Sequence, residues 1–343
     1  MPHRTFMSFI WPSALAMLLF IALPIVSVAV QSLFVAHEQV FVEVENCGPF
    51  GCTTVQKIDS QATAALRAAQ PLGQFNGLGT YLNRNHLASA EISEAWQTRT
   101  DLAGFMSKIL NLPFYKALSF TLTYTFVVTP FVIILGFFVA LAVNRLPSFI
   151  KGPTIFISLL PMIVTPLIGS LILFWMIDAD GLIGGTLQLI FDDPDLSLKA
   201  SPALTWVTLI VYGVWHSAPF SFIVFYAGLQ TVPKDTLESA MIDGANRWEQ
   251  VRYVVIPHLL PLVVFISLMQ LMDNFRVFEP IVGFSAQAHA TSLSWIIFND
   301  LAGSEGQFFG SAGATSVITI IGVSILLIPV LIRTWRDFSR KVV

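Results

Sequence analysis

Long apolar runs separated by short polar segments dominate the chain. Six of these runs reach or approach the about 20 residues that an α-helix needs to cross the hydrocarbon core of a bilayer. They cover residues 8–34, 116–144, 154–177, 203–229, 257–283 and 312–333. The pattern predicts an all-α, polytopic membrane protein with six transmembrane helices. A polar stretch between the first two runs, residues 35–115, is long enough to form a loop domain outside the membrane.

Several of the predicted spans contain proline. These residues are Pro24, Pro130, Pro161, Pro166 and Pro219. Proline breaks a helix in water, but it is tolerated in a span because neighbouring helices satisfy the freed backbone groups. We therefore expect kinked spans.

The first apolar run follows His3 and Arg4, an arrangement found in both membrane anchors and cleavable signal peptides. The run is long for a signal peptide and has no clear small-residue cleavage site, which favours an uncleaved anchor. Either interpretation places residues 35–115 outside the cytoplasm.

Basic residues near the span ends predict the orientation. All of them lie on one side if both termini are cytoplasmic: Arg4, Arg145, Lys151, Lys234, Arg247, Arg252, Arg333, Arg336, Arg340 and Lys341. The short loop between the third and fourth spans is instead acidic, with Asp178, Asp180, Asp192, Asp193 and Asp195 against a single Lys199. This asymmetry follows the positive-inside rule.

The layout that results has four parts. Residues 1–34 form the first span with a cytoplasmic N-terminus, and residues 35–115 form the extracytoplasmic loop domain. Residues 116–333 form a five-helix core containing a polar loop at 231–257, and residues 334–343 form a cytoplasmic tail.

Composition agrees with a membrane location and limits the partners. Of the 343 residues, 55% are hydrophobic and only 11% are charged, and the mean hydropathy is +0.73. Soluble domains carry about 25% charged residues. The net charge of -3 and the lack of a basic run interleaved with aromatic residues argue against a nucleic-acid partner.

The two cysteines of the chain, Cys47 and Cys52, both lie in the loop domain. The spacing C-G-P-F-G-C contains residues that turn the backbone, and the predicted compartment is oxidising, so a local disulfide is favoured over two free thiols.

The polar loop at 231–257 carries two helix-start patterns and one stop. Pro233 suits a first helical turn, and Asp235 with Glu238 resembles a capping pair. Asn246 followed by Glu249 repeats this pattern.

Between the two starts, Gly244 predicts a helix stop, because glycine adopts left-handed backbone angles without steric cost. The loop is therefore predicted to fold as helix, sharp turn, helix. Leu237, Ala240 and Met241 are predicted to share one face of the first helix, a surface suited to docking another protein.

This loop resembles the cytoplasmic motif of binding-protein-dependent ABC permeases, which reads E-A-A, two residues, D-G-A, and a proline about a dozen residues later. Here the motif stands as Glu238-Ser239-Ala240, Asp243-Gly244-Ala245 and Pro257, with serine in place of the middle alanine. An ordinary amphipathic loop helix is the alternative interpretation.

The resemblance implies a type I ABC importer permease core in a bacterial inner membrane. It implies that the loop is the coupling helix, which docks on an ATPase dimer. It also implies a second homologous permease subunit and an extracytoplasmic solute-binding protein as partners, with ATP and magnesium bound by the ATPase and no cofactor in this chain.

Further similarity to maltose-type sugar permeases extends from about Pro113 to the C-terminus and suggests a sugar or sugar derivative as solute. The similar stretches are Asn111-Leu112-Pro113, Ala117–Asn144, Pro161 and Pro166 followed by Trp175, Gly181-Leu182-Ile183, and Asp273–Gly283. The family's Gly- or Thr-rich turn after the last of these is replaced by Ser285-Ala286-Gln287-Ala288.

Polar residues at membrane depth are costly and usually face a water-filled path. The candidates in the fifth span are Gln270, Asp273, Asn274, Arg276 and Glu279. The i,i+3 spacing of its charged members predicts either a solute-facing cluster or a buried ion-pair ladder.

The fourth span offers Trp215 and His216, which suit a sugar surface, although such residues are more often packing or interface residues. Arg276 would also suit an anionic sugar derivative.

No catalytic site is predicted. The chain has no G-x-x-x-x-G-K-[ST] phosphate loop, its six histidines lack metal-ligand spacing, and no nucleophile elbow occurs. Alternatives are a permease for a polyamine, phosphate or metal, and an ion-coupled carrier, although the internal repeat expected of a carrier is missing. A membrane-embedded enzyme is a further alternative, and it is disfavoured by the lack of paired acids and histidines at membrane depth.

Overall fold

The computed structural model describes residues 3–37, 41–48, 51–70, 72–99, 101–303 and 308–340. The chain divides into two compact units. Unit 1 comprises Met1–Tyr115 with Ile296–Ile320, and unit 2 comprises Lys116–Trp295 with Ile321–Val343. Residues 296–320, which the hydrophobic pattern places in the core, thus group with the polar loop domain.

Within the described residues, five helical stretches are long and apolar enough to cross a membrane. They are Phe6–Gln31, Pro113–Asn144 (α7), Pro202–Leu229 (α11), Arg247–Phe275 and Phe309–Arg333. The first consists of α1 (His3–Met17), a π-helical turn (Leu18–Ala22) and α2 (Leu23–Gln31). The last is part of α17 (Phe309–Arg340). A bent helix pair brings the number to six if it is counted as one span. The prediction of a polytopic, mainly helical protein is confirmed.

The predicted third span is not a single helix. α8 (Ser148–Ile163) and α9 (Pro166–Met176) meet at an angle of 93°. The break lies at the residues before Pro166, whose ring clashes with helical geometry in the preceding residue and which has no N–H for the helix ladder. The expected kink is therefore a right-angled break here, whereas Pro130 and Pro219 remain inside α7 and α11.

The predicted fifth span is displaced toward the N-terminus. It begins with α13 (Arg247–Gln250), continues through a π-helical turn (Val251–Val255) and ends with α14 (Ile256–Phe275). The turn lies directly before Pro257, and the Ile256 N–H bonds to the Val251 carbonyl five residues back. Residues 279–283, predicted to belong to this span, form a separate short helix, α15 (Glu279–Gly283).

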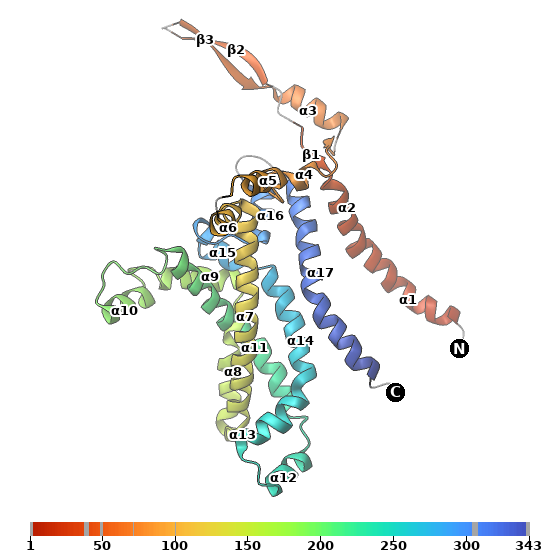
Figure 1. The fold of residues 1–343 in the computed structure, drawn as a ribbon, viewed down its shortest axis with the longest axis vertical. Helices are drawn as coiled ribbons and strands as arrows, with labels where there is room; N and C mark the ends of the chain where they lie inside the picture. Colours follow the sequence, from red (N-terminus) through yellow and green to blue (C-terminus); the bar gives the residue numbers. More distant parts are fainter. Residues whose placement is uncertain are drawn as a thin grey trace. The chain divides into compact units, whose positions relative to one another are not determined.

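The remaining helices of unit 2 are short. They are α10 (Leu182–Phe191), α12 (Lys234–Ile242), a 3-10 turn (Ala286–Ala288) and α16 (Leu293–Ala302), the last of which continues into unit 1. In Figure 1, α12 lies at the end of unit 2 where α13 also begins, and α11 packs against both α8 and α14.

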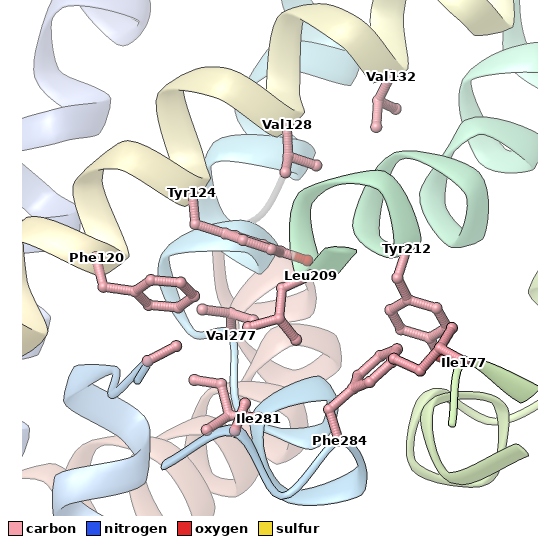
Figure 2. Close-up of a cluster of buried hydrophobic side chains, with 12 residues drawn as sticks. Phe120, Tyr124, Val128, Val132, Ile177, Leu209, Tyr212, Val277, Ile281 and Phe284 are labelled. Atoms are coloured by element: carbon pink, nitrogen blue, oxygen red, sulfur yellow. The ribbon is translucent and has the colours of Figure 1, made fainter. Parts of the chain in front are cut away.

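The larger buried cluster of unit 2 joins α7, α11, the end of α9 and the segment around α15 (Figure 2). α7 contributes Phe120, Tyr124, Val128 and Val132, one residue per helical turn. α11 contacts this face closely, because a Cβ at Gly213 would overlap the Tyr124 hydroxyl. Glycine is therefore required at this helix crossing.

A second buried cluster lies further along α7, α11 and α14. It consists of Ala140, Val143, Phe222, Phe225, Leu229, Val255, Leu259 and Ile266, and half-buried Leu237 of α12 packs against it. The polar loop at 231–257 is thus attached to the core by an apolar side chain.

Unit 1 contains the described strands, which the all-α expectation missed. β1 (Phe34–Val35) pairs with β4 (Gln74–Phe75), and β2 (Phe41–Gly48) forms a hairpin with β3 (Gly51–Ile58). Its helices between the strands and α7 are α3 (Ser60–Ala69), α4 (Gly79–Leu82), α5 (Ser89–Gln97) and α6 (Leu102–Leu110).

A buried histidine anchors the loop segment of unit 1 to the start of α17. His86 is completely buried, and its Nδ1 donates to Asn83 Oδ1 at 2.8 Å, an oxygen that also accepts the Asn85 N–H. Its Nε2 lies 3.1 Å from both the Ser311 carbonyl and Thr315 Oγ1. No feature of the sequence around residue 86 predicts these contacts.

The β2–β3 hairpin places Cys47 and Cys52 directly opposite each other in register. Cα atoms of opposed antiparallel residues are about 4.5–5.5 Å apart, within the range that a disulfide spans. The two side chains lie outside those that the structure describes, so the disulfide stays a prediction.

Candidate functional site

The coupling segment, residues 231–257, connects α11 to α14 and begins with α12. Pro233 precedes the first helical residue with φ of −62°, as a helix start requires. The capping role predicted for Asp235 is wrong, because the helix starts at Lys234 and Asp235 lies inside its first turn without a side-chain cap bond. There its carboxylate still faces the positive end of the helix dipole.

The turn after α12 has the geometry that the Asp-Gly pair predicts. Gly244 has φ of +84°, in the left-handed region that side chains disfavour. The Ala245 N–H bonds to the Ala240 carbonyl at 2.9 Å and the Gly244 N–H bonds to the Met241 carbonyl at 3.1 Å. This pair of bonds is a Schellman motif, which ends α12 abruptly.

The second helix start is confirmed as a complete capping box. The Asn246 side chain accepts the N–H groups of Trp248 and Glu249 at 2.9 and 3.0 Å. The Glu249 carboxylate in turn accepts the Asn246 N–H at 2.7 Å. The turn and the next helix are thus specified by consecutive residues.

The apolar residues Leu237, Ala240 and Met241 lie in a continuous helix at the spacing of one face, but they differ in exposure. Leu237 and Ala240 are half-buried, whereas Met241 and Ile242 are 55% and 86% exposed. The polar residues of the motif surround this tip, and Glu238, Ser239, Asp243 and Gly244 are all exposed. The segment therefore presents an apolar tip with a polar rim, which is the composition of a docking surface.

The predicted polar cluster splits into a buried part and an exposed part. Gln270 and Asn274 on α14 are 4% and 5% exposed. Asn274 Nδ2 donates to Thr129 Oγ1 of α7 at 3.1 Å and to Gln270 Oε1 at 3.4 Å. These three residues form a polar contact between two spans.

The ion-pair ladder is only partly formed. Arg276 pairs with Asp273 at 3.1 Å, but both side chains are more than half exposed. α14 ends at Phe275, so Arg276 follows that helix as its C-cap residue, whereas Glu279 begins α15, and the two do not share a helix face. The ion pairs among the described residues do not include Glu279, and the prediction of a continuous buried ladder is wrong.

His216 has a structural contact at the break between α8 and α9. Its Nε2 donates to the Val164 carbonyl at 3.2 Å. One helical turn earlier, the Tyr212 hydroxyl donates to the Pro166 carbonyl at 2.7 Å. The first bond satisfies the Val164 carbonyl, which the end of α8 leaves without a helical partner, and both bonds attach the corner to α11.

Trp215 is 45% exposed and lines an apolar cavity of about 390 Å³ together with Tyr212 and Phe284. None of the five polar residues of the fifth-span cluster lines this cavity. The fourth-span and fifth-span candidates therefore do not meet there.

The sequence analysis did not include Thr129 and Tyr212 among the candidate residues. For Thr129, a pattern in the sequence does indicate a buried position. Thr121, Thr125 and Thr129 recur at four-residue intervals in the apolar α7 and are buried. Hydroxyl groups at this spacing lie on one helix face and mark it as facing protein rather than lipid.

In the described part of the chain, no group of three or more His, Cys, Asp or Glu side chains is placed to hold a metal ion.

Comparison with known families gives a match over most of the chain. The model of the family described as "Binding-protein-dependent transport system inner membrane component" matches residues 102–338. The match contains the coupling segment, both parts of the polar cluster and the corner at Pro166.

Curated relatives share about a third of their residues or fewer with this chain. The "Probable ABC transporter permease protein y4oQ" of Sinorhizobium fredii is 27% identical, covering 69% of this chain and 77% of the relative. The "Maltodextrin transport system permease protein MalC" of Streptococcus pneumoniae is 30% identical over 63% of this chain, and the match spans 53% of MalC. The "Multiple sugar-binding transport system permease protein MsmF" of Streptococcus mutans is 31% identical over 61% of this chain and 73% of the relative.

Among solved structures, a chain of "a bacterial ABC transporter involved in the import of the acidic polysaccharide alginate" has the same fold. Its TM-score is 0.60 at 19% identity, covering 81% of this chain and 97% of that chain. A complex of an alginate transporter with its "alginate pentasaccharide-bound periplasmic protein" gives a TM-score of 0.55 at 20% identity, covering 79% of this chain and 94% of that chain.

Proposed function

We propose that this chain, which belongs to the binding-protein-dependent transport system inner membrane component family, forms the solute path of an ATP-driven importer for a sugar or sugar derivative. Members of this family are permease subunits of ABC transporters and are not catalytic. The chain is a multi-pass membrane protein. ATP and magnesium are therefore assigned to a separate ATPase subunit, and this chain has the mechanical role.

The coupling segment is the observation that carries the proposal. Its exposed Met241 and Ile242 would enter a groove of the ATPase, and the rim residues Glu238 and Asp243 would contact polar groups around that groove. The left-handed Gly244 turn holds this tip in one orientation. A segment with these features has no role in a carrier driven by an ion gradient.

Motion of this tip has a direct route into the membrane. The helix that follows the turn runs without interruption from Arg247 to Phe275, 29 residues, or about 40 Å at 1.5 Å per residue. Its first residues leave the coupling segment, and its last turn carries Gln270 and Asn274. A displacement of α12 is therefore transmitted along one rigid element to the polar cluster.

Alternating access needs only two packed arrangements of this helix. Shifting a two-state gate from 1:99 to 99:1 takes about 5.5 kcal/mol of differential binding, which closure of an ATP-bound dimer can supply. The further partners in this scheme are a second permease subunit and an extracytoplasmic solute-binding protein. Both termini are assigned to the cytoplasm, on the side of the basic residues.

The relatives named for maltodextrin and multiple-sugar transport support a sugar as the solute. The chemistry of the polar cluster agrees, because the amides of Gln270 and Asn274 with the Thr129 hydroxyl donate and accept hydrogen bonds as a sugar requires. We assign these residues, with Asp273, Arg276 and Glu279, to the solute path. Trp215 remains a candidate at its edge, and His216 is assigned to the corner at Pro166.

The test is solute-stimulated ATP hydrolysis by the assembled complex in lipid nanodiscs. Glu238→Ala should leave assembly and membrane insertion intact while reducing stimulation by the loaded binding protein at least tenfold. Glu91→Ala on α5 removes the same charge outside the coupling segment and is the matched control. Normal stimulation in the Glu238 variant would refute the coupling assignment.

A further inference from the structure

A groove lies between the end of α7 and the coupling segment, and the transport scheme assigns no ligand to it. It consists of two adjoining cavities of about 410 and 380 Å³. The two cavities share Leu141, Arg145, Arg247 and Val251 among their lining residues, so they adjoin each other and are described together. We call this space the basic groove.

Its charge is of one sign. Arg145 follows α7 and Arg247 begins α13, so two separate elements bring guanidinium groups to the same space. No Asp or Glu lines either cavity. Ion pairs among the described residues join Lys199 to Asp178 and Arg276 to Asp273, and neither includes these arginines.

The nearest acidic residue in sequence is already engaged. Glu249 accepts the Asn246 backbone N–H in the capping box, which directs its carboxylate to the helix start. Two guanidinium groups facing a space without carboxylates match a phosphate group, whose oxygens accept paired N–H donors.

The groove continues into an apolar stripe along α7. Phe131, Leu135 and Phe138 are 56%, 41% and 51% exposed, and they recur at helical spacing in line with Ala142 and Arg145. On a membrane span such a stripe faces acyl chains. Trp248, which lines the groove and is 59% exposed, is the residue type enriched at the membrane–water interface.

We propose that the basic groove binds an anionic phospholipid, with the phosphate headgroup between Arg145 and Arg247 and an acyl chain along the α7 stripe. The site goes beyond the transport role, although its location at the cytoplasmic leaflet rests on the orientation proposed above. An acidic side chain of a partner protein fits less well, because the apolar stripe extends to membrane depth, where an aqueous partner does not reach.

The site has a consequence for coupling. Arg247 is the first residue of α13 and follows Asn246 of the capping box directly. A headgroup held by Arg247 and Arg145 therefore ties the start of the transmitting helix to the end of α7, and lipid composition modulates how freely the coupling segment moves.

Lipid counting on the assembled complex tests the proposal. The detergent-solubilised complex is titrated with phosphatidylglycerol, and bound lipid is counted by native mass spectrometry, with phosphatidylcholine as the neutral comparison. Arg145→Gln and Arg247→Gln should each weaken phosphatidylglycerol binding about fivefold, and the double variant about 25-fold, from the usual contribution of one basic residue near an anionic lipid. Millimolar inorganic phosphate should not displace the lipid, because the stripe supplies part of the affinity.

Arg252→Gln is the matched control. It removes the same charge five residues after Arg247 in the same helical stretch. Arg252 lies over the Tyr253 ring and lines neither cavity. This variant should bind phosphatidylglycerol as the wild type does. If the arginine variants fail to fold, Ala142→Trp fills the groove while both arginines remain, and it should remove the bound lipid.

Three results would overturn the proposal. They are equal binding of phosphatidylcholine, unchanged phosphatidylglycerol binding by the double variant or by Ala142→Trp, and loss of the ATPase subunit from the double variant with lipid binding retained. The last result would assign the groove to a protein partner. Since lipid counting requires neither ATP nor solute, its failure leaves the importer assignment untouched, and that assignment fails separately in the Glu238→Ala assay.

Discussion

The coupling segment and the polar cluster lie at opposite ends of the same 29-residue helical stretch, yet their structures arise in different ways. In the coupling segment, each bond that shapes the turn joins residues at most five positions apart. In the polar cluster, the bond between Asn274 and Thr129 joins residues 145 positions apart.

The two regions therefore respond differently when helices move. A locally determined turn keeps its shape when distant parts of the protein move, which suits the proposed role of the coupling segment in transmitting motion. A contact between spans can break and reform when helices shift, which suits the proposed role of the polar cluster in the solute path.

The largest expected effect comes from breaking the local turn. Gly244→Val places a β-branched residue at φ of +84°, where strain costs about 1–3 kcal/mol. A Cβ at this position meets no atom within 4 Å, so the effect is purely conformational. Solute-stimulated ATPase activity should fall by about tenfold or more while the complex remains assembled.

Gly244→Asn is the control for this variant, because asparagine tolerates left-handed angles. It should retain most of the stimulation. Equal losses in both variants would indicate that the residue acts through a contact and not through its backbone.

The next effect concerns the contact between spans. Asn274→Leu leaves the Gln270 carbonyl oxygen and the Thr129 hydroxyl without this partner, and an unsatisfied buried polar group costs about 1–3 kcal/mol. The thermal midpoint of the complex should fall, and transport of the cognate solute should weaken.

Arg276→Leu separates solute contact from stability. Its pair with Asp273 is more than half exposed, so its removal costs about 1 kcal/mol or less. If Arg276 contacts solute, transport is impaired at an unchanged thermal midpoint. A large fall in the midpoint would instead assign Arg276 a structural role and remove it from the solute path.

A smaller effect, on the pH dependence of stability, is expected in unit 1. There the buried His86 is held by contacts with residues more than 200 positions away in the sequence. Burial lowers the pKa of His86 below its usual value of 6.5. As the pH falls, the unfolded chain therefore binds a proton on this histidine at a higher pH than the folded protein does. The free energy of unfolding keeps its full value above about pH 6.5 and decreases below it, by at most about 1.4 kcal/mol per pH unit.

His86→Gln should remove this dependence in thermal unfolding between pH 7.5 and 5.5. Burial raises the pKa of the nearby Asp300, which acts with the opposite sign, so the difference between wild type and variant isolates the histidine. Identical pH profiles for the two proteins would exclude His86 as the titrating group.

The smallest effect on transport is expected at the β2–β3 hairpin. A disulfide between Cys47 and Cys52 would close a loop of six residues and stabilise it by about 2 kcal/mol or less. The double Cys→Ser variant should transport normally with a modestly lower midpoint. Both thiols should resist alkylation in intact membranes until a reductant is added, and alkylation without reductant would show that they are free.

The sequence by itself determined the features that depend on neighbours along the chain. These are the approximate positions of most apolar spans, the Gly244 stop and the Asn246 capping box. Hydrophobic length and turn chemistry act over a few residues, so they can be predicted without the fold.

Tertiary structure alone decided the rest. Whether Pro166 kinks or breaks a span depends on its tertiary surroundings, where Tyr212 and His216 of α11 bond to the carbonyls of Pro166 and Val164. α14 ends at Phe275, before Arg276 and Glu279, although the spacing of Asp273, Arg276 and Glu279 predicts one helix face. Such outcomes depend on partners tens to hundreds of residues away, and local spacing carries no information about them.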